Sequence, residues 1–326
     1  FLCGLFRHGD RSPIRAYPTD PYQESAWPQG FGQLSQVGMQ QHYNLGQFLR
    51  KRYTGFLNES YDRHEISVRS TDYDRTLMSA EANLAGLYPP SGSQVFNPNV
   101  KWQPVPVHTV PMAEERSQHN LTAPDWVTPE VMSKLKYLKD FGFRTLFGVY
   151  KPIEKSRLQG GMLLGEIVKN LTAMASEHSR PRLKLMMLSA HDTTVTALQA
   201  SLKVFNGIQP PYASCHIIEL YKDNGSFSVS MFYRNDTELY QLQLPGCALD
   251  CPLEDFKALT KPSISDDRDA ECQLSSHGTN KEVIISLAVS GCLLFLLVAM
   301  LLAVICRQTD PMRTRGYEHV INGDES

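Results

Sequence analysis

The sequence has almost no net charge, because 32 lysines and arginines are balanced by 34 aspartates and glutamates, which gives −2 at pH 7. This balance argues against a nucleic acid or another polyanion as the partner. The sequence also lacks an internal repeat, which excludes a solenoid or a propeller. Cys247 and Cys251 are closely spaced, but no histidines cluster beside them, so a zinc site is not expected. We therefore expect a globular protein that uses neither a metal nor another cofactor.

Long uncharged runs are absent except for one near the C-terminus. Residues 283–306 form a run of 24 residues without a charge, which at about 1.5 Å per residue is long enough to cross a bilayer as a tilted helix. A buried core helix is the alternative, but it would be shorter and would carry a polar face. Arg307, Arg313 and Arg315 follow the run, against Lys281 before it. This bias predicts that the C-terminal end lies in the cytosol.

The uncharged run divides the chain into three predicted parts. Residues 1–282 form a lumenal or extracellular domain, residues 283–306 a transmembrane helix and residues 307–326 a cytoplasmic tail, as in a single-pass type I membrane protein. No leader sequence is visible, so we expect that a signal peptide has been removed. In the tail, Tyr317 and Val320 resemble a tyrosine-based sorting signal, although this spacing also arises readily by chance. We expect the lysosomal or the plasma membrane as the location.

Sequences that accept N-linked glycans favour the same secretory route. Any one Asn-x-Ser/Thr sequence arises easily by chance, but this chain has five. They begin at Asn58, Asn120, Asn170, Asn224 and Asn235.

The most informative motif follows an apolar run at the N-terminus. Residues 1–6 have the pattern of a buried strand, and residues 7–13 continue as Arg-His-Gly-Asp-Arg-Ser-Pro. Arginine matches phosphate oxygens with two N–H groups, and glycine lets backbone amides approach the same anion. The charges of Arg7 and Arg11 would also lower the pKa of His8 and keep its imidazole neutral in acid. A surface cluster of charged residues is the alternative, and the number of fixed positions argues against it.

A second motif, Ser-Ala-His-Asp-Thr-Thr at residues 189–194, lies far downstream. Together the two motifs resemble the signature of the histidine acid phosphatases. Residues 27–32, 156–161 and 211–216 extend the resemblance through most of residues 1–282.

This resemblance implies roles for six residues. His8 is the residue that is transiently phosphorylated, and Asp192 protonates the leaving oxygen. The phosphoryl group is held by Arg7, Arg11, Arg69 and His191. The resemblance also implies phosphomonoester substrates and a homodimer.

The chemistry of these residue types supports the same assignment. Phosphoryl transfer builds charge on the equatorial oxygens, which guanidinium and imidazole donors stabilise without a metal. A phosphohistidine divides one difficult displacement into two easier steps. Asp192 is placed to act as the general acid, and the need for a protonated carboxyl predicts an acidic pH optimum. Aspartate is also a favoured N-cap and a helix is expected from Thr193 onward, so Asp192 has a second, compatible interpretation.

Strand and helix patterns alternate along the chain, which predicts an α/β fold. The resemblance specifies a histidine-phosphatase-like sheet with flanking helices. The expected strands are residues 1–6, 65–69 and 183–188, with a hairpin of residues 216–221 and 227–233. The expected helices are residues 34–53, 76–87, 130–147 and 156–175. Strand 183–188 would deliver His191 and Asp192 at its carboxyl end, where open α/β sheets bind ligands.

The chain departs from the family pattern in its middle. Residues 104–111 resemble the family closely, but residues 112–117 lead almost directly to residues 120–124. Full-length relatives insert several helices of an α-domain at this junction, so the chain resembles a shortened form with a truncated α-domain near residues 112–119. The loss would expose apolar surface, at a cost of roughly 25 cal/mol per Å².

The cysteines give two further expectations. The spacing of Cys247 and Cys251 predicts a local disulfide in an oxidising lumen. Cys215 and Cys272 resemble family cysteines whose partners lie in the missing segment, while Cys3 lies in a buried strand. We expect Cys215 and Cys272 either to bond to each other or to remain reactive thiols in an unstable domain.

Two classes of function therefore stay open. The first is a membrane-anchored acid phosphatase that hydrolyses phosphate monoesters, phosphotyrosine among them, through a phosphohistidine. The second is a catalytically silent, shortened membrane glycoprotein that misfolds or pairs with a full-length partner. The intact site chemistry favours the first.

Overall fold

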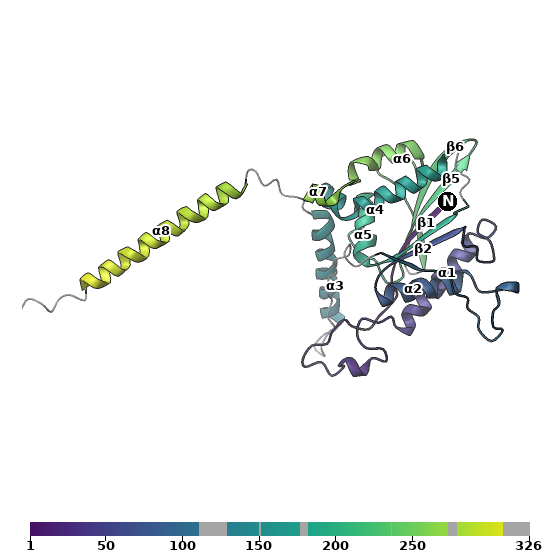
Figure 1. Ribbon diagram of the computed structural model, residues 1–326, viewed down its shortest axis with the longest axis horizontal. Coiled ribbons are helices and arrows are strands. Elements are labelled where there is room, and N and C mark those ends of the chain that lie inside the picture. Colours follow the sequence, from purple (N-terminus) through teal and green to yellow (C-terminus); the bar gives the residue numbers. More distant parts are fainter. Residues whose placement is uncertain (111–128, 150, 177–181, 236, 273–278, 309–326) are drawn as a thin grey trace, which may run out of the picture. The chain divides into compact units, whose positions relative to one another are not determined.

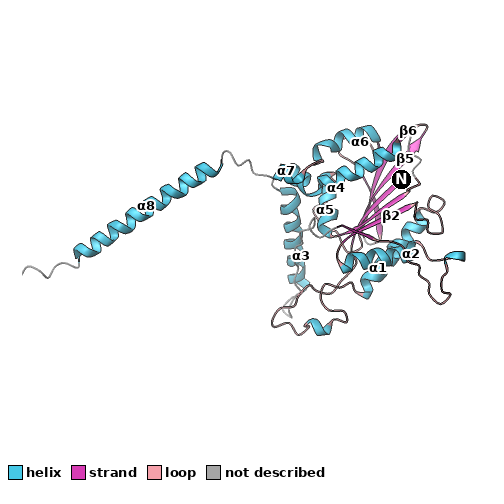
Figure 2. Cartoon of the chain, viewed as in Figure 1, coloured by secondary structure: helices cyan, strands magenta, loops and turns pink. Residues whose placement is uncertain are grey.

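The structure is a computed structural model of the 326-residue chain, and it describes residues 1–110, 129–149, 151–176, 182–235, 237–272 and 279–308. The chain divides into two compact units, Phe1–Glu271 and Cys272–Ser326. The first unit contains a mixed sheet with helices on both faces (Figures 1 and 2). The predicted α/β class is confirmed.

The sheet has the strand order β3-β2-β4-β1-β5-β6-β7, and β8 pairs with β6 beside β7. The strands are β1 Leu2–Arg7, β2 Ile66–Thr71, β3 His108–Val110, β4 Leu185–Ala190, β5 Cys215–Asp223, β6 Ser226–Asn235, β7 Glu238–Leu242 and β8 Asp250–Pro252. The strands β3, β2, β4 and β1 run parallel, and the pairs from β1 to β5 onward are antiparallel. The central strand β1 therefore joins the parallel and antiparallel halves.

The helices of the first unit are α1 Gln36–Arg52, α2 Asp74–Leu87, α3 Pro129–Arg144, α4 Pro152–Ala175, α5 Asp192–Ser201 and α6 Leu253–Thr260. A π-helical turn, η4 Thr145–Val149, extends α3. Helix α1 begins two residues later than expected, because the side chain of Ser35 accepts a hydrogen bond from Gly38 N at 3.1 Å and acts as the N-cap. The hairpin β5–β6 is confirmed, with Asn224 and Gly225 in the turn at φ 49° and 85°.

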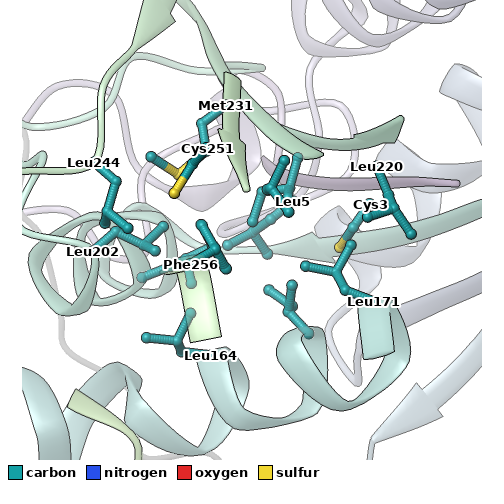
Figure 3. Packing of buried hydrophobic residues seen from close by; sticks show 14 of the residues in the cluster. Cys3, Leu5, Leu164, Leu171, Leu202, Leu220, Met231, Leu244, Cys251 and Phe256 are labelled. Atoms are coloured by element: carbon teal, nitrogen blue, oxygen red, sulfur yellow. The ribbon is translucent and has the colours of Figure 1, made fainter. Parts of the chain in front are cut away.

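Two hydrophobic cores lie on opposite faces of the sheet. Alternate residues of β1 point to opposite sides, so that Leu2 and Phe6 join the core under α1 and α2. Cys3 and Leu5 join the core under α4, α5 and α6 (Figure 3). A strand buried on both faces is typical of the parallel part of an α/β sheet. The cores therefore explain why residues 1–6 form one continuous apolar run.

Helices α1 and α2 pack closely because each contributes a glycine at the contact. A Cβ atom on Gly46 would overlap the backbone oxygen of Asn83, and one on Gly86 would overlap the backbone oxygen of Tyr43. The backbones therefore touch without intervening side chains. This seam fixes α2, whose first turn lies beside the candidate site described below.

In the second unit, helix α8 Thr279–Gln308 covers the uncharged run at residues 283–306. Within the residues that the structure describes, no helix is long and apolar enough to cross a membrane. The structure supports the prediction of a helix but not that of a transmembrane helix.

The disulfide between Cys247 and Cys251 is confirmed, with a Cα–Cα distance of 5.5 Å. Cys215 and Cys272 are both free, which excludes the first of the two alternatives, a bond between them. Cys215 lies fully buried next to β1, and burial raises the pKa of its thiol to about 12. It is therefore a protected thiol, whereas Cys272 is exposed.

Several predicted features lie outside the described residues: the junction at residues 112–119, the glycosylation site Asn120, and Tyr317 and Val320 of the tail. The four remaining sequons begin at residues that are exposed or half-buried, namely Asn58, Asn170, Asn224 and Asn235. Their glycosylation stays a prediction.

Candidate active site

The two sequence motifs meet at the carboxyl ends of β1 and β4. The strands are parallel neighbours in register, with Arg7 opposite Ala190. The chain leaves both strands at this point, and His8 N donates a hydrogen bond to Ala190 O at 2.9 Å. His8 and His191 therefore face each other, with ring centroids 5.4 Å apart. This is the edge at which open α/β sheets bind ligands.

His8 is buried and held in one tautomer. Its side chain is embedded in the protein, and Nδ1 lies 2.8 Å from the carbonyl oxygen of Gly9. A carbonyl only accepts hydrogen bonds, so Nδ1 carries the proton, and Nε2 of the neutral ring is left with its lone pair. Burial, followed by the charge of Arg7, lowers the pKa of His8 well below 6.5, and Arg75 and His191 act in the same direction. Its nitrogen Nε2 is therefore an available nucleophile in acid.

Arg7 connects three parts of the site. Its guanidinium donates to Pro210 O at 2.7 Å, pairs with Asp192 Oδ2 at 3.0 Å and lies 4.0 Å from the centre of the Tyr212 ring. Arg11 donates to Ser12 O at 2.9 Å. The Nε groups of both arginines are buried without a hydrogen-bond partner among the described residues. A bound phosphate would supply the acceptors that these groups lack.

Asp192 lies in the first turn of α5, where the helix dipole favours a negative charge. The N-cap of this helix is His191, so the alternative interpretation of Asp192 as the cap is wrong. The side chain of Asp192 accepts hydrogen bonds from Thr193 N, at 2.8 Å, and from Gln209 Nε2. With Arg7, these contacts fix both carboxyl oxygens at the edge of the site.

His191 lies between β2 and the first motif. Its Nε2 is 3.1 Å from Thr71 Oγ1, at the last residue of β2. Its ring also packs against Tyr73, with a centroid distance of 5.2 Å. The end of β2 therefore reaches the site through Thr71 and Tyr73.

Arg69 does not join this group. It lies two residues before the end of β2, exposed, in register with Leu188 and His108. Arg75 in the first turn of α2 occupies the corresponding place: its guanidinium lies 4.6 Å from the centre of the Tyr73 ring, and its charge lowers the pKa of His8. Open α/β sheets bind ligands beyond the carboxyl ends of their strands. An arginine at the start of the next helix, such as Arg75, was therefore a better candidate than one within β2.

Sequence reasoning also missed residues that approach the site from loops and from α3. Tyr212 packs against both Arg7 and His8, with a ring centroid distance of 5.7 Å to His8. Lys139 of α3 has an exposed side chain, yet partial loss of hydration and the charges of Arg7 and Arg11 lower the pKa of its ammonium group. Tyr212 lies within residues 211–216, which extend the family resemblance, and Lys139 lies in the predicted helix 130–147, but neither pattern indicates a role in the site. Across the described residues, no three His, Cys, Asp or Glu side chains are grouped in a way that would hold a metal ion.

Comparison with known proteins identifies relatives of the chain. The family model of the histidine phosphatase superfamily (branch 2) matches residues 1–129 and 114–234. Lysosomal acid phosphatase from Homo sapiens is 48% identical over 392 aligned positions, which cover 100% of this chain and 92% of that protein. Prostatic acid phosphatase from Bos taurus is 44% identical over 350 positions, with 87% of this chain and 90% of that protein covered.

Solved structures share the fold at low sequence identity. The phytase from Citrobacter braakii superposes with a TM-score of 0.61 at 17% identity, covering 84% of this chain and 99% of that chain. The apo form of Hafnia alvei phytase gives the same TM-score and identity, covering 84% of this chain and 97% of that chain.

Proposed function

The chain belongs to branch 2 of the histidine phosphatase superfamily, and we propose that it is an acid phosphatase that hydrolyses phosphate monoesters through a phosphohistidine on Nε2 of His8. The curated relatives described above are named acid phosphatases, which supports this reaction class. The observation that carries the proposal is the buried, neutral imidazole of His8 beside arginine N–H groups that lack acceptors.

The proposed reaction has two steps. His8 Nε2 attacks phosphorus, the bond from phosphorus to the alcohol oxygen breaks, and Asp192 gives its proton to that oxygen. In the second step Asp192 takes a proton from water, whose oxygen attacks the phosphohistidine and releases inorganic phosphate. Arg7, Arg11 and Arg75 stabilise the charge on the equatorial oxygens in both steps. The first step needs a protonated Asp192, so we expect faster turnover in acid.

Substitution of the nucleophile tests the mechanism. We expect His8→Ala to reduce kcat for p-nitrophenyl phosphate by a factor of at least about 10³, because no other residue of the site replaces a covalent nucleophile. His64→Ala is the matched control, since His64 is exposed on a loop. Activity of His8→Ala within about tenfold of the starting protein would contradict the phosphohistidine.

Substitution of the proposed acid tests the first step separately. Asp192→Asn should slow alkyl phosphates much more than p-nitrophenyl phosphate, because nitrophenolate departs without a proton. Equal losses on both substrates would show that Asp192 only supports the helix and Arg7. Phosphotyrosine belongs among the proposed substrates because the proposed roles concern the phosphoryl group and the leaving oxygen, and none selects the rest of the alcohol. A phosphotyrosine peptide assayed beside the alkyl phosphate tests this point.

Membrane attachment is a separate proposal that rests on the sequence of residues 283–306. The uncharged run and the basic residues after it support a single-pass anchor. The relative named lysosomal supports a lysosomal location for the catalytic part. Extraction of cell membranes with alkaline carbonate tests the anchor, and release of the full chain into the supernatant would contradict it.

The second candidate function is a silent, shortened glycoprotein. The alignment to the lysosomal relative has 392 positions against 326 residues here, and the family match breaks into two overlapping pieces at residues 114–129. These facts support a missing internal segment near the predicted junction. Assay of a purified, glycosylated protein separates the two candidates, because a folded protein without turnover would favour the silent form.

A further inference from the structure

The loop between α5 and β5, residues 202–214, forms one wall of the candidate site. Arg7 holds it through the bond to Pro210 O and through its own backbone N–H, which donates to Ser214 O at 3.0 Å. Ala213 N donates to His8 O at 3.2 Å. The wall is therefore attached to the first motif on its inner side.

Helix α3 holds the same loop from the outer side. Asp140 Oδ1 accepts a hydrogen bond from Gln209 N at 3.0 Å, and Arg144 Nε donates to Gly207 O at 3.1 Å. Phe143 and Phe147 pack on Ala197 of α5 in a small separate core. The backbone of the loop is thus fixed between the sheet and α3.

The side chain of Gln209 extends from this loop to Asp192. Its Nε2 donates to Asp192 Oδ2, the oxygen that also pairs with Arg7. Asp192 Oδ1 accepts from the backbone of Thr193. Because both carboxyl oxygens are held, the carboxyl group has one orientation, and Gln209 is the member of this set that comes from outside both sequence motifs.

We propose that Gln209 is a positioning residue for Asp192, and that Asp140 of α3 sets the position of Gln209. This inference rests on the proposed function, since it concerns protonation of the leaving oxygen by Asp192. A general acid acts only when its proton is directed at the leaving atom within hydrogen-bond distance. Helix α3 thereby influences protonation of the leaving oxygen, because Asp140 holds Gln209 and Gln209 holds Asp192.

The test measures leaving-group dependence in Gln209→Met, which keeps the side-chain length and removes the donor. Loss of the hydrogen bond that holds the carboxyl group corresponds to a factor of about ten in rate. We expect kcat for an alkyl phosphate to fall by about tenfold or more, kcat for p-nitrophenyl phosphate to fall less than about threefold, and KM for both to change little. Gln40→Met is the matched control, since Gln40 is exposed on α1 and hydrogen-bonds only to Asn44 among the described residues.

A second variant keeps the test decisive if Gln209→Met folds poorly. Asp140→Ala removes the acceptor for Gln209 N and should give the same selective loss at a smaller size, about threefold to tenfold, because it acts through Gln209. Equal losses on both substrates in either folded variant would overturn the inference, as would a change confined to KM, which would make Gln209 a phosphate ligand. If the starting protein turned over neither substrate, the proposed function would fail first, and the inference with it.

Discussion

The helix pair α1 and α2 and the helix α3 differ in how completely they are packed. At the α1–α2 contact, a Cβ atom on Gly46 would overlap the opposing backbone. In α3, a Cβ on Gly142 would meet nothing within 4 Å, and Tyr137, Leu138 and Phe141 are 62%, 59% and 50% exposed. The α1–α2 pair is therefore closely packed, whereas α3 exposes apolar side chains to solvent. We call the α1–α2 pair the closed layer and α3 the open layer.

This difference bears on the site, because each layer contributes to it. Arg75 comes from the closed layer, in the first turn of α2, and its charge reaches His8. Asp140 and Lys139 come from the open layer, in α3. The α1–α2 pair therefore contributes a charge that lowers the pKa of His8, while α3 contributes a contact to Gln209, which hydrogen-bonds to Asp192.

The largest expected effect is on the closed layer. Gly46→Ala forces a methyl group into the backbone of α2, and we expect the free energy of unfolding to fall by about 3 kcal/mol or more. Chemical denaturation followed by circular dichroism measures this change. A loss below about 1 kcal/mol would show that the seam between α1 and α2 opens easily, and the contrast with α3 would disappear.

Acid stability tests the same layer through His42, which is fully buried in α1 with Nε2 at 3.0 Å from Arg7 O. Burial lowers its pKa from 6.5 to about 4. Below pH 6.5 the imidazole of His42 is protonated in the unfolded chain but stays neutral in the folded protein. The free energy of unfolding therefore decreases as the pH falls from 6.5 toward 4. We expect a loss of about 2 kcal/mol between pH 7 and pH 5 from this residue alone.

The matched variant for this prediction is His42→Gln, which keeps a donor for Arg7 O and does not titrate. Its free energy of unfolding should fall less steeply over the same pH range. An unchanged slope would place the acid sensitivity elsewhere, with fully buried His216, whose pKa burial also lowers to about 4, as the next residue to test.

A pair of charge substitutions compares the two layers at the site. Arg75→Gln removes a charge that lowers the pKa of His8, so that pKa should rise and the acid limb of kcat/KM should move to higher pH. We expect kcat/KM near pH 5 to fall by about tenfold or more, since a phosphate donor is also lost. Lys139→Gln should leave the acid limb in place. The pH profiles of kcat/KM for p-nitrophenyl phosphate check both variants. Equal shifts of the acid limb in the two variants would show that α2 and α3 influence His8 to the same extent.

The smallest expected effect is a gain in the open layer. Gly142→Ala adds a methyl group where there is space and removes backbone freedom from the unfolded chain. We expect an increase of about 0.5–1 kcal/mol in the free energy of unfolding, measured as for Gly46→Ala. Destabilisation would mean that α3 is more tightly covered than its exposed residues indicate.

The elements that sequence analysis predicted well are those with strong periodicity or a local motif. The apolar runs at β1 and β4, the Asn224–Gly225 turn and the spacing of Cys247 and Cys251 each depend on near neighbours, and all four appear in the structure. The strands β3 and β8 were missed because three residues each are too few to show alternation.

The candidate site was predicted only in part. The two motifs located His8 and Asp192 because each directly follows a buried strand. Arg69 was predicted as the third arginine because it lies in a recognisable strand, whereas the position of Arg75 depends on where the chain turns into α2. The structure brings Arg75 rather than Arg69 near His8. Gln209 reaches Asp192 across 17 residues of helix and loop. A contact between residues in two different segments leaves no periodic pattern in the sequence.

The place of β1 in the middle of the sheet has a consequence for synthesis of the chain. This strand is among the first residues described, yet both of its neighbours, β4 and β5, are made more than 180 residues later. At roughly 5–20 residues per second, the ribosome needs on the order of 10–40 s to reach them. During that interval β1, whose residues before Arg7 are apolar, and His8, which follows it, lack both neighbouring strands. We therefore expect the catalytic edge to assemble late, after the α1–α2 pair has formed from local contacts.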